Sequence, residues 1–351
     1  MVDGLLARGF DVTVLHSGRH EVEFARPVEH VHTDPHFEEP LRDGLAGRAF
    51  DLTVSMYGRA RLTAEIMRGR TERFIHVGGT FYRTWVDGRL LTRDRRAEPP
   101  WHPVLADTAS VADETTPSEP ASRFSELAIR TEDAVLRAGE GGDYRATVVR
   151  FPQIYGPGQP APVEWSIVRR WRDGRTAILV PADGILASTR CYSRNAAEVI
   201  LGVVDHPAES AGEVFNAGDA EALTVRGWIE AIADALGARF RLVGIPFEAA
   251  ALTYPYALYP WHGVHRLLDI GKARRLLGYR PVPAATGLAE TVHWYRDHPL
   301  RDDSDEARRL GDTFDYAMED RLISALDALT PLAEGRPAYA HPYRHPGNSV
   351  G

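Results

Sequence analysis

The sequence is poor in cysteine and lysine, and each shortage excludes particular bonds or sites. Cys191 is the single cysteine among 351 residues, which excludes an intramolecular disulfide and a zinc site built on cysteines. Lys272 is the single lysine, and Leu268 stands four residues before it, so no Tyr-x-x-x-Lys pair occurs anywhere in the chain. The basic side chains are therefore nearly all arginines, which differ from lysines at specific sites.

The chain also lacks an excess of positive charge and any long apolar run. Its 49 acidic and 41 basic residues give a net charge of −8, whereas a nucleic-acid partner requires a basic face. We recognise no signal peptide, and no apolar run approaches the ~20 residues that a membrane span needs. We therefore expect a cytoplasmic, soluble protein with no nucleic-acid and no membrane partner.

The first half of the chain alternates strand-like and helix-like segments. Such alternation with apolar strands predicts an α/β fold, in which a parallel sheet is covered on both faces. The polar, Pro-rich segment from about 84 to 120 has no clear periodicity and is expected to be a long functional loop. The predicted strands are 11–16, 28–34, 50–56, 73–79 and 144–152, and the predicted helices are 2–9, 37–47, 61–69 and 122–139.

The second half shows a different pattern, in which amphipathic helices are separated by short strands. We expect a smaller lobe here, followed by a further helix and a tail rich in Pro, His and Gly. The predicted helices are 163–174, 193–206, 224–237 and 311–329, and the predicted strands are 175–181, 213–218 and 239–246.

Several phrases occur in the order that one protein family uses. They include LLARGFDVTVLHSGR, RFIHVGGTFYRT, the Arg-x-Pro-x-x-Tyr-Gly-Pro-Gly phrase of residues 150–158, and DIGKARRLLGYRP. In register over about 2–295, the chain resembles the extended short-chain dehydrogenase/reductase superfamily, the NAD(P)-dependent epimerase/dehydratase-like proteins. The resemblance implies a Rossmann-like, doubly wound parallel sheet with a smaller C-terminal α/β substrate lobe.

The resemblance also implies a domain organisation. Residues 1–155 correspond to a Rossmann-like dinucleotide-binding domain, residues 156–300 to a substrate-binding lobe interleaved with it, and residues 301–351 to a C-terminal helix and a loosely ordered tail.

The sequence departs from the family at its amino end. The family's first strand and Gly-x-x-Gly-x-x-Gly loop are missing, although that loop lets the backbone approach a pyrophosphate. The missing strand would lie at the centre of the sheet, and its two neighbours would lose their ladder partners. Our preferred explanation is a start codon placed too late, and the alternative is a truncated protein that cannot hold a dinucleotide.

The second departure is in the catalytic pair. Phe124 and Ala128 stand where the family has its Tyr and Lys, and Glu132 supports this register because the family often places an acid there. Phe124 has no proton to give and Ala128 has no charge. General acid–base catalysis is typically worth about 10²–10⁴-fold, so the family's standard mechanism should be crippled.

The resemblance assigns catalytic candidates to the segment after the strand at 73–79. Thr80 occupies the place of the family's catalytic Ser/Thr, and the alternative is a Thr that fixes a Gly-Gly turn. Tyr82 is a candidate substitute acid, and the alternative is a structural aromatic. We predict no metal site, because the tail histidines His341 and His345 stand among prolines and do not form a helical pair.

The resemblance also assigns ligand-binding candidates. Arg19 mildly favours NADP over NAD, since no acid stands at Leu15, His16 or Ser17. A solvated arginine, a helix-capping aspartate and surface ion pairs are the alternatives. The cofactor-binding candidates are Arg19, Asp34, Met56, Tyr57, Gly58, Arg150, Pro152 and Ile154, and the substrate-binding candidates are Trp165, Arg169, Arg190 and Tyr192.

Three functions follow as hypotheses. The first is an atypical NAD(P)-dependent epimerase/dehydratase or reductase that acts on a small carbonyl, hydroxyl or nucleotide-linked substrate. The second is a catalytically silent member of the fold that serves as a ligand-binding or regulatory scaffold. The third is an isomerase or lyase without hydride transfer. A homodimer is the default expectation from the family.

Overall fold

A four-stranded parallel sheet lies at the centre of the protein, with the strand order β11-β6-β4-β3. The structure is a computed structural model that describes residues 1–18, 21–56, 59–85, 111–257 and 264–328. Its strands read as apolar runs because both faces of the sheet are buried. The bounds are β3 (Phe50–Ser55), β4 (Thr71–Gly79), β6 (Arg145–Phe151) and β11 (Val214–Asn216).

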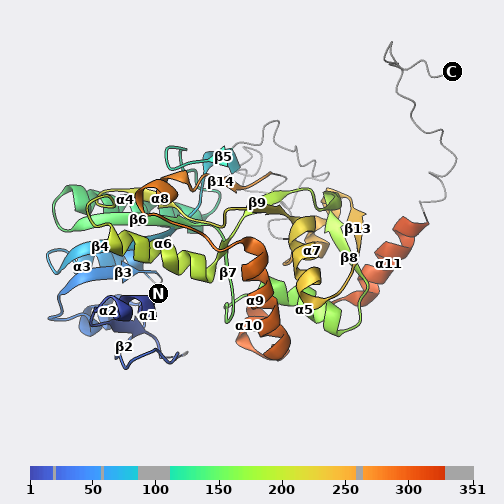
Figure 1. Cartoon of the computed structure of the whole chain (residues 1–351), viewed down its shortest axis with the longest axis horizontal. Coiled ribbons are helices and arrows are strands. Elements are labelled where there is room, and N and C mark those ends of the chain that lie inside the picture. Colours follow the sequence, from blue (N-terminus) through green and yellow to red (C-terminus); the bar gives the residue numbers. More distant parts are fainter. Residues whose placement is uncertain (19–20, 57–58, 86–110, 258–263, 329–351) are drawn as a thin grey trace, which may run out of the picture. The chain divides into compact units, whose positions relative to one another are not determined.

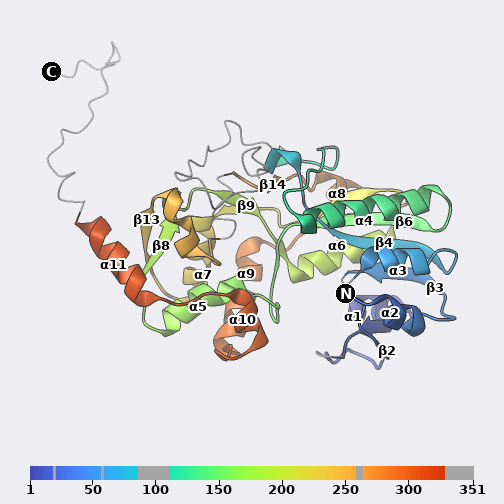
Figure 2. The same ribbon diagram turned by 180° about the vertical axis from the view of Figure 1, so that it is seen from behind.

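Alternate residues of these strands pack against helices on opposite faces, as the pleat requires. Phe74 and Val148 pack with the first helix layer, which is α2 (Glu38–Gly44), α3 (Ala60–Ile66) and α4 (Arg123–Glu140). Ile75 and Val149 pack with the second layer, which is α1 (Val2–Ala7) and α6 (Ser193–Asp205). Figure 1 shows α6 in front of the sheet, and Figure 2 shows α3 and α4 in front of it. The predicted parallel sheet with two covered faces is confirmed.

Two further parallel strands form a separate pair near the amino end. They are β1 (Thr13–His16) and β2 (Glu29–His32), and the register places His16 opposite His32. Among the described strands β1 pairs only with β2, and β3 pairs only with β4. The ladder is therefore interrupted between β1 and β3.

The second half of the chain builds small sheets and helices around the carboxyl side of the main sheet. β11 is an exception, because it leaves this half and pairs with β6 in the main sheet. The strand pairs are β5 (Val111–Ala112) with β14 (Leu267–Leu268), β7 (Ile154–Tyr155) with β10 (Cys191–Tyr192), β8 (Ala177–Pro181) with β13 (Arg241–Ile245), and β9 (Ala187–Thr189) with β12 (Ala222–Thr224). The helices are α5 (Val163–Arg172), α7 (Val225–Leu236), α8 (Gly271–Leu276), α9 (Ala284–Asp297) and α10 (Asp305–Leu310), with short 3₁₀ turns at Arg83–Trp85, Ala182–Gly184 and Phe247–Thr253.

The chain divides into two compact units, residues 1–312 and residues 313–351. The second contains α11 (Tyr316–Asp327), which begins at an Asp315 side chain that caps the Met318 N–H at 3.0 Å. The loop predicted near 84–120 and the tail lie largely outside the described residues. No described helix has the length and apolar character needed to cross a membrane.

Candidate functional site

A cleft of about 2040 Å³ opens at the carboxyl ends of β3, β4 and β6. Ligands of parallel α/β sheets bind at this edge. Thr80 and Phe81 line the cleft from the end of β4, and Pro152 and Ile154 line it from the end of β6. Thr80 makes no hydrogen bond with another described residue, so its hydroxyl is available to a ligand.

Helix α4 forms one wall of the cleft. At positions 124 and 128, where the family has its Tyr and Lys, this wall has no acidic or basic side chain. Phe124 is 74% exposed and meets Phe81 edge to face, with ring centroids 6.0 Å apart. Ala128 lines the same wall. Ser122 and Ser125 also line it, but they close a capping box at the start of α4 and are bonded to each other. The wall thus offers an aromatic surface where the family has its acid–base pair.

Tyr82 lines the cleft, and it belongs with Arg150 to one buried hydrogen-bond network. The Arg150 guanidinium donates to both carboxylate oxygens of Glu132 on α4, with Nε to Oε2 at 3.0 Å, and its Nη1 donates to the Tyr82 hydroxyl at 3.0 Å. The Tyr82 hydroxyl in turn donates to the Asn216 amide oxygen on β11. The network therefore connects β6, α4, the segment after β4, and β11.

The electrostatics of this network oppose a role for Tyr82 as a proton donor. Burial would lower the pKa of Arg150, but the hydrogen bonds and charge of Glu132 outweigh it and raise that pKa. Burial raises the pKa of Tyr82, more than the nearby Arg150 cation lowers it. Because Tyr82 is fully buried and its hydroxyl already has two partners, the geometry favours the structural alternative.

The remaining predicted cofactor residues lie in different places. Asp34 follows β2, and its carboxylate accepts from the backbone N–H and Nδ1 of His36, at 3.0 and 2.9 Å. Met56 follows β3, is 38% exposed and lines the cleft. The predictions at Arg19, Tyr57 and Gly58 lie outside the described residues.

A second cavity, of about 900 Å³, lies where the ladder is interrupted between β1 and β3; we call it the β1–β3 slot. Val12 and Val14 line it from one side and Leu52 and Val54 from the other. Met56 lines both the slot and the cleft, so the two cavities adjoin. Among the described residues, no glycine-rich turn stands at this junction to approach a pyrophosphate.

None of the four predicted substrate residues lines the cleft. Trp165 is buried in α5, and Arg190 is buried with its guanidinium 4.0 Å from the ring centre of Trp228. Arg169 forms ion pairs with Asp173 and Asp302. Tyr192 is also buried and donates its hydroxyl to Glu290 at 2.6 Å, and burial raises its pKa to about 12. Packing and ion pairing thus occupy the side chains that the resemblance assigned to the substrate.

Sequence reasoning missed the charge of the cleft. Its lining holds seven arginines and only three glutamates. Arg61 pairs with Glu65, and Arg123 and Arg130 pair with Glu126, but an excess of positive charge remains that suits an anionic ligand. The seven arginines come from separate elements, and no sequence phrase joins them. They are Arg59, Arg61, Arg123, Arg130, Arg137, Arg266 and Arg309, and the glutamates are Glu38, Glu65 and Glu119.

Two buried ionisable groups have shifted pKa values of opposite kind. His76 on β4 lines the cleft, and burial lowers its pKa to about 4. Its Nδ1 has no hydrogen-bond partner among the described residues. Glu164 on α5 is fully buried, and burial raises its pKa to about 7, although the Arg190 charge opposes this. Each group is therefore held toward its neutral form in the folded protein.

The comparisons with known proteins agree with this architecture. The sequence profile of the NAD dependent epimerase/dehydratase family matches residues 103–218. The dTDP-glucose 4,6-dehydratase DesIV from Streptomyces venezuelae, with NAD and TYD bound, is 21% identical over 84% of this chain and 92% of that chain, with a TM-score of 0.62. A comparison with curated proteins gave no match.

Two more solved structures are similar. A UDP-galactose 4-epimerase is 16% identical over 85% of this chain and 95% of its own, with a TM-score of 0.62. The RMD of Pseudomonas aeruginosa, complexed with NADPH, is 15% identical over 81% of this chain and 99% of its own, with a TM-score of 0.57. The predicted Rossmann-like fold is confirmed, and the family profile over residues 103–218 agrees with the predicted superfamily.

We predict that Glu132→Gln lowers the free energy of unfolding by about 3 kcal/mol, because it leaves the Arg150 cation buried without its counter-charge. The double variant Glu132→Leu/Arg150→Met should recover most of the loss. Urea unfolding measures both. Glu126→Gln is the control, since Glu126 forms solvent-exposed ion pairs with Arg123 and Arg130 of the same helix. An equal, small effect of the substitutions at 126 and 132 would contradict the prediction.

We also predict opposite pH responses at His76 and Glu164. The folded pKa of His76 lies below its ordinary 6.5, so the unfolded state binds more protons and stability falls as pH drops from about 6.5 to 4. The folded pKa of Glu164 lies above its ordinary 4.5, so stability falls as pH rises from about 4.5 to 7.

In the parent protein the two groups change the free energy of unfolding in opposite directions between about pH 4.5 and 6.5. From pH 7 to pH 5, His76→Gln should therefore gain about 2 kcal/mol relative to the parent and Glu164→Gln should lose about 2 kcal/mol, as linkage over these shifts requires. Urea unfolding at pH 5, 6 and 7 checks this. Curves parallel to the parent's in both variants would refute it.

Proposed function

We propose, from the premise that this chain is a member of the extended short-chain dehydrogenase/reductase superfamily, that its cleft binds an anionic, nucleotide-linked compound carrying a hydroxyl or carbonyl group. In this proposal the protein acts with NAD or NADP as an atypical epimerase/dehydratase or reductase. The solved structures named above are of such enzymes, with NAD or NADPH bound in two of them.

The excess of arginine in the cleft lining is the observation that carries the proposal. Guanidinium groups bind phosphate oxygens through paired, charge-assisted hydrogen bonds. Arg59 precedes α3 near the end of β3, and Arg309 lies on α10 at another part of the lining. Charges on separate elements suit an elongated ligand with more than one anionic group, as a nucleotide-linked compound has.

Thr80 is the polar group best placed for chemistry. Its hydroxyl stands at the carboxyl end of β4, beside the ends of β3 and β6, and can donate a hydrogen bond to a carbonyl or hydroxyl oxygen. The proton of the reaction cannot go to a side chain at 124 or 128. His76 lies in the same lining as a neutral imidazole, held so by burial.

A second candidate, a catalytically silent binding protein, is favoured by one specific observation. Phe124 and Phe81 form an aromatic pair in the cleft, where a proton donor would have to stand. An aromatic surface can stack a base or a sugar face without any chemical step. The two candidates share a ligand class and differ only in turnover.

We expect calorimetry to detect binding of NADPH, NADH and a nucleotide sugar such as UDP-glucose. Arg59→Ala should weaken nucleotide-sugar binding about tenfold, since one phosphate-directed guanidinium is lost. Arg194→Ala is the matched control, because Arg194 is exposed, pairs with Glu290 and lies outside the cleft lining. NADPH is the first cofactor to titrate, in line with Arg19 after β1.

The same titrations belong on a version extended to the preceding in-frame start, because the β1–β3 slot adjoins the cleft at Met56. Cofactor binding by the extended version alone would support the dinucleotide part of the proposal. Folded protein that binds neither cofactor nor nucleotide sugar in either version would overturn it.

We expect Thr80→Val to lower any turnover about 10²-fold, as the loss of one well-placed donor usually does, and Phe124→Leu to leave turnover nearly unchanged. A screen with NAD(P) and nucleotide sugars measures both. Equal turnover in Thr80→Val and the parent would remove Thr80 from the mechanism. No turnover in the parent, together with turnover in Phe124→Tyr/Ala128→Lys, would select the silent binding protein.

A further inference from the structure

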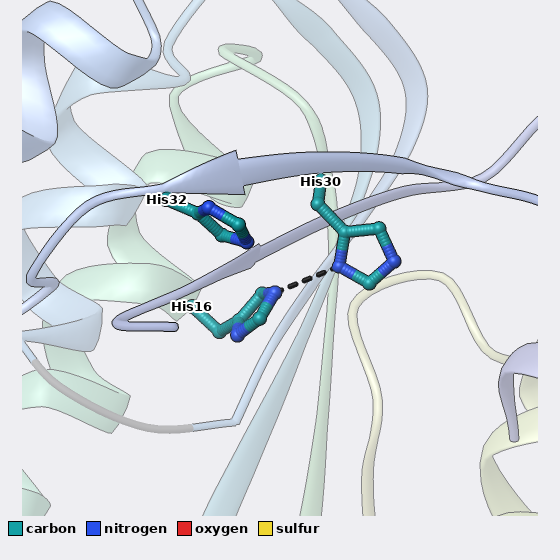
Figure 3. A group of neighbouring side chains, drawn as sticks. All are labelled: His16, His30 and His32. Atoms are coloured by element: carbon teal, nitrogen blue, oxygen red, sulfur yellow. Dashed lines mark hydrogen bonds between the residues drawn. The ribbon is translucent and has the colours of Figure 1, made fainter. Parts of the chain in front are cut away.

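Three histidines meet on one side of the β1–β2 pair, although His16 lies fourteen residues before His30. The parallel register sets His16 directly opposite His32, and the strand alternation puts His30 on the same side as His32. Figure 3 shows the three imidazoles converging, His16 from β1 and the other two from β2. None of the three lines the cleft. We call them the histidine triad.

The spacing of the triad suits a tetrahedral metal ion. One nitrogen of each ring lies within 4.8 Å of a nitrogen of each other ring. The ring centroids are 5.0 Å apart for His16 and His30, 4.9 Å for His16 and His32, and 6.0 Å for His30 and His32. With Zn–N bonds of about 2.0–2.1 Å, imidazole centroids around a tetrahedral ion lie about 5 Å apart. Small side-chain rotations would therefore bring one nitrogen of each ring to bonding distance from a shared ion.

A carboxylate stands next to the triad and can complete it. Glu21 Oε1 is 3.0 Å from Nε2 of His32, and both side chains are more than half exposed. Three imidazole nitrogens plus one carboxylate or water oxygen form a donor set typical of Zn²⁺. The hard ions Mg²⁺ and Ca²⁺ prefer oxygen donors and do not suit it.

The protons of the triad are arranged for exchange with a cation. His16 Nδ1 accepts the Gly18 N–H at 3.2 Å, so the His16 proton sits on Nε2 and is donated to His30 Nδ1 at 2.7 Å. Coordination through Nε2 moves this proton to Nδ1, and the Gly18 N–H turns away. Gly18 already has a φ of +75°, where glycine moves without strain.

We propose that His16, His30 and His32 form a metal site for a borderline divalent transition ion, Zn²⁺ foremost, with Glu21 or water as the fourth ligand. The ion would cross-link β1 and β2. That matters because a two-stranded unit is only marginally stable alone, and among the described strands this pair has no third partner. The site is independent of the proposed function, since it needs neither the cofactor nor the cleft.

The test is calorimetric titration of the full chain with Zn²⁺ alone, followed by Co²⁺ absorption and hydrogen exchange. We expect one Zn²⁺ per chain with a dissociation constant of about 1 μM or tighter, intense visible Co²⁺ bands of tetrahedral type, and slower exchange in residues 13–32 with Zn²⁺. Mg²⁺ should do none of these. Each of His16→Gln, His30→Gln and His32→Gln should weaken Zn²⁺ binding at least tenfold.

Two controls separate the triad from other histidines. His36→Ala removes an exposed imidazole of the same segment, and His341→Ala/His345→Ala removes those of the tail; both should bind Zn²⁺ like the parent. The three triad substitutions lie at a surface, and circular dichroism confirms that the variants fold. Absence of Zn²⁺ binding in the parent, binding unchanged by the triad variants, or binding lost in the tail variant would overturn the proposal.

Discussion

The buried ion pair between Arg150 and Glu132 fixes the geometry on which the cleft depends. It joins the end of β6 to the middle of α4, and through Tyr82 and Asn216 it reaches β11. A buried cation without this carboxylate would be strongly unfavourable, so the distance between helix and sheet has little freedom. Phe124 and Ala128 lie on the same helix as Glu132. The wall of the cleft thus keeps its place whatever side chains stand at those two positions.

This separation of support from chemistry explains how the fold persists without the Tyr and Lys of its relatives. The groups that hold the sheet to α4 are Arg150, Glu132 and Tyr82, whose polar atoms are bonded to one another. Loss of the acid–base pair therefore leaves packing intact. The arginines of the lining remain, so the cleft can bind an anionic ligand whether or not the protein catalyses a reaction.

The sequence predicts those parts of the molecule that local pattern determines. Apolar strands and amphipathic helices of the first half were predicted because short apolar runs and the period of 3.6 are visible in single segments. Helix α9 was not, because Gly287 and Thr291 weaken its helical signal, and packing against α5 and α7 stabilises it instead. The residues assigned to the substrate by resemblance show the other limit. Trp165 and Arg190 satisfy core packing, which no local pattern reports.

Contacts that depend on the pairing register of two strands could not be predicted from the sequence either. His16 and His30 are fourteen residues apart, and only the parallel pairing of β1 with β2 brings them together. Thr80 and Ile154 were placed correctly at the cleft edge because the carboxyl ends of parallel strands share one side of a sheet. Topology alone decides which residues reach the cleft edge, whereas competition between side chains for partners is not visible in the sequence.

The β1–β3 slot leaves two strand edges to which another molecule could add a strand. Its two bordering strands each present a row of backbone donors and acceptors that no described strand satisfies, and Val12, Val14, Leu52 and Val54 contribute apolar side chains to its walls. Such edges are templates for strands of other molecules. Asp11 and Asp51, which lie along the rim, are the kind of charge that discourages such addition. Strand addition at these two edges would join copies of this chain, and the carboxylates of Asp11 and Asp51 oppose such addition.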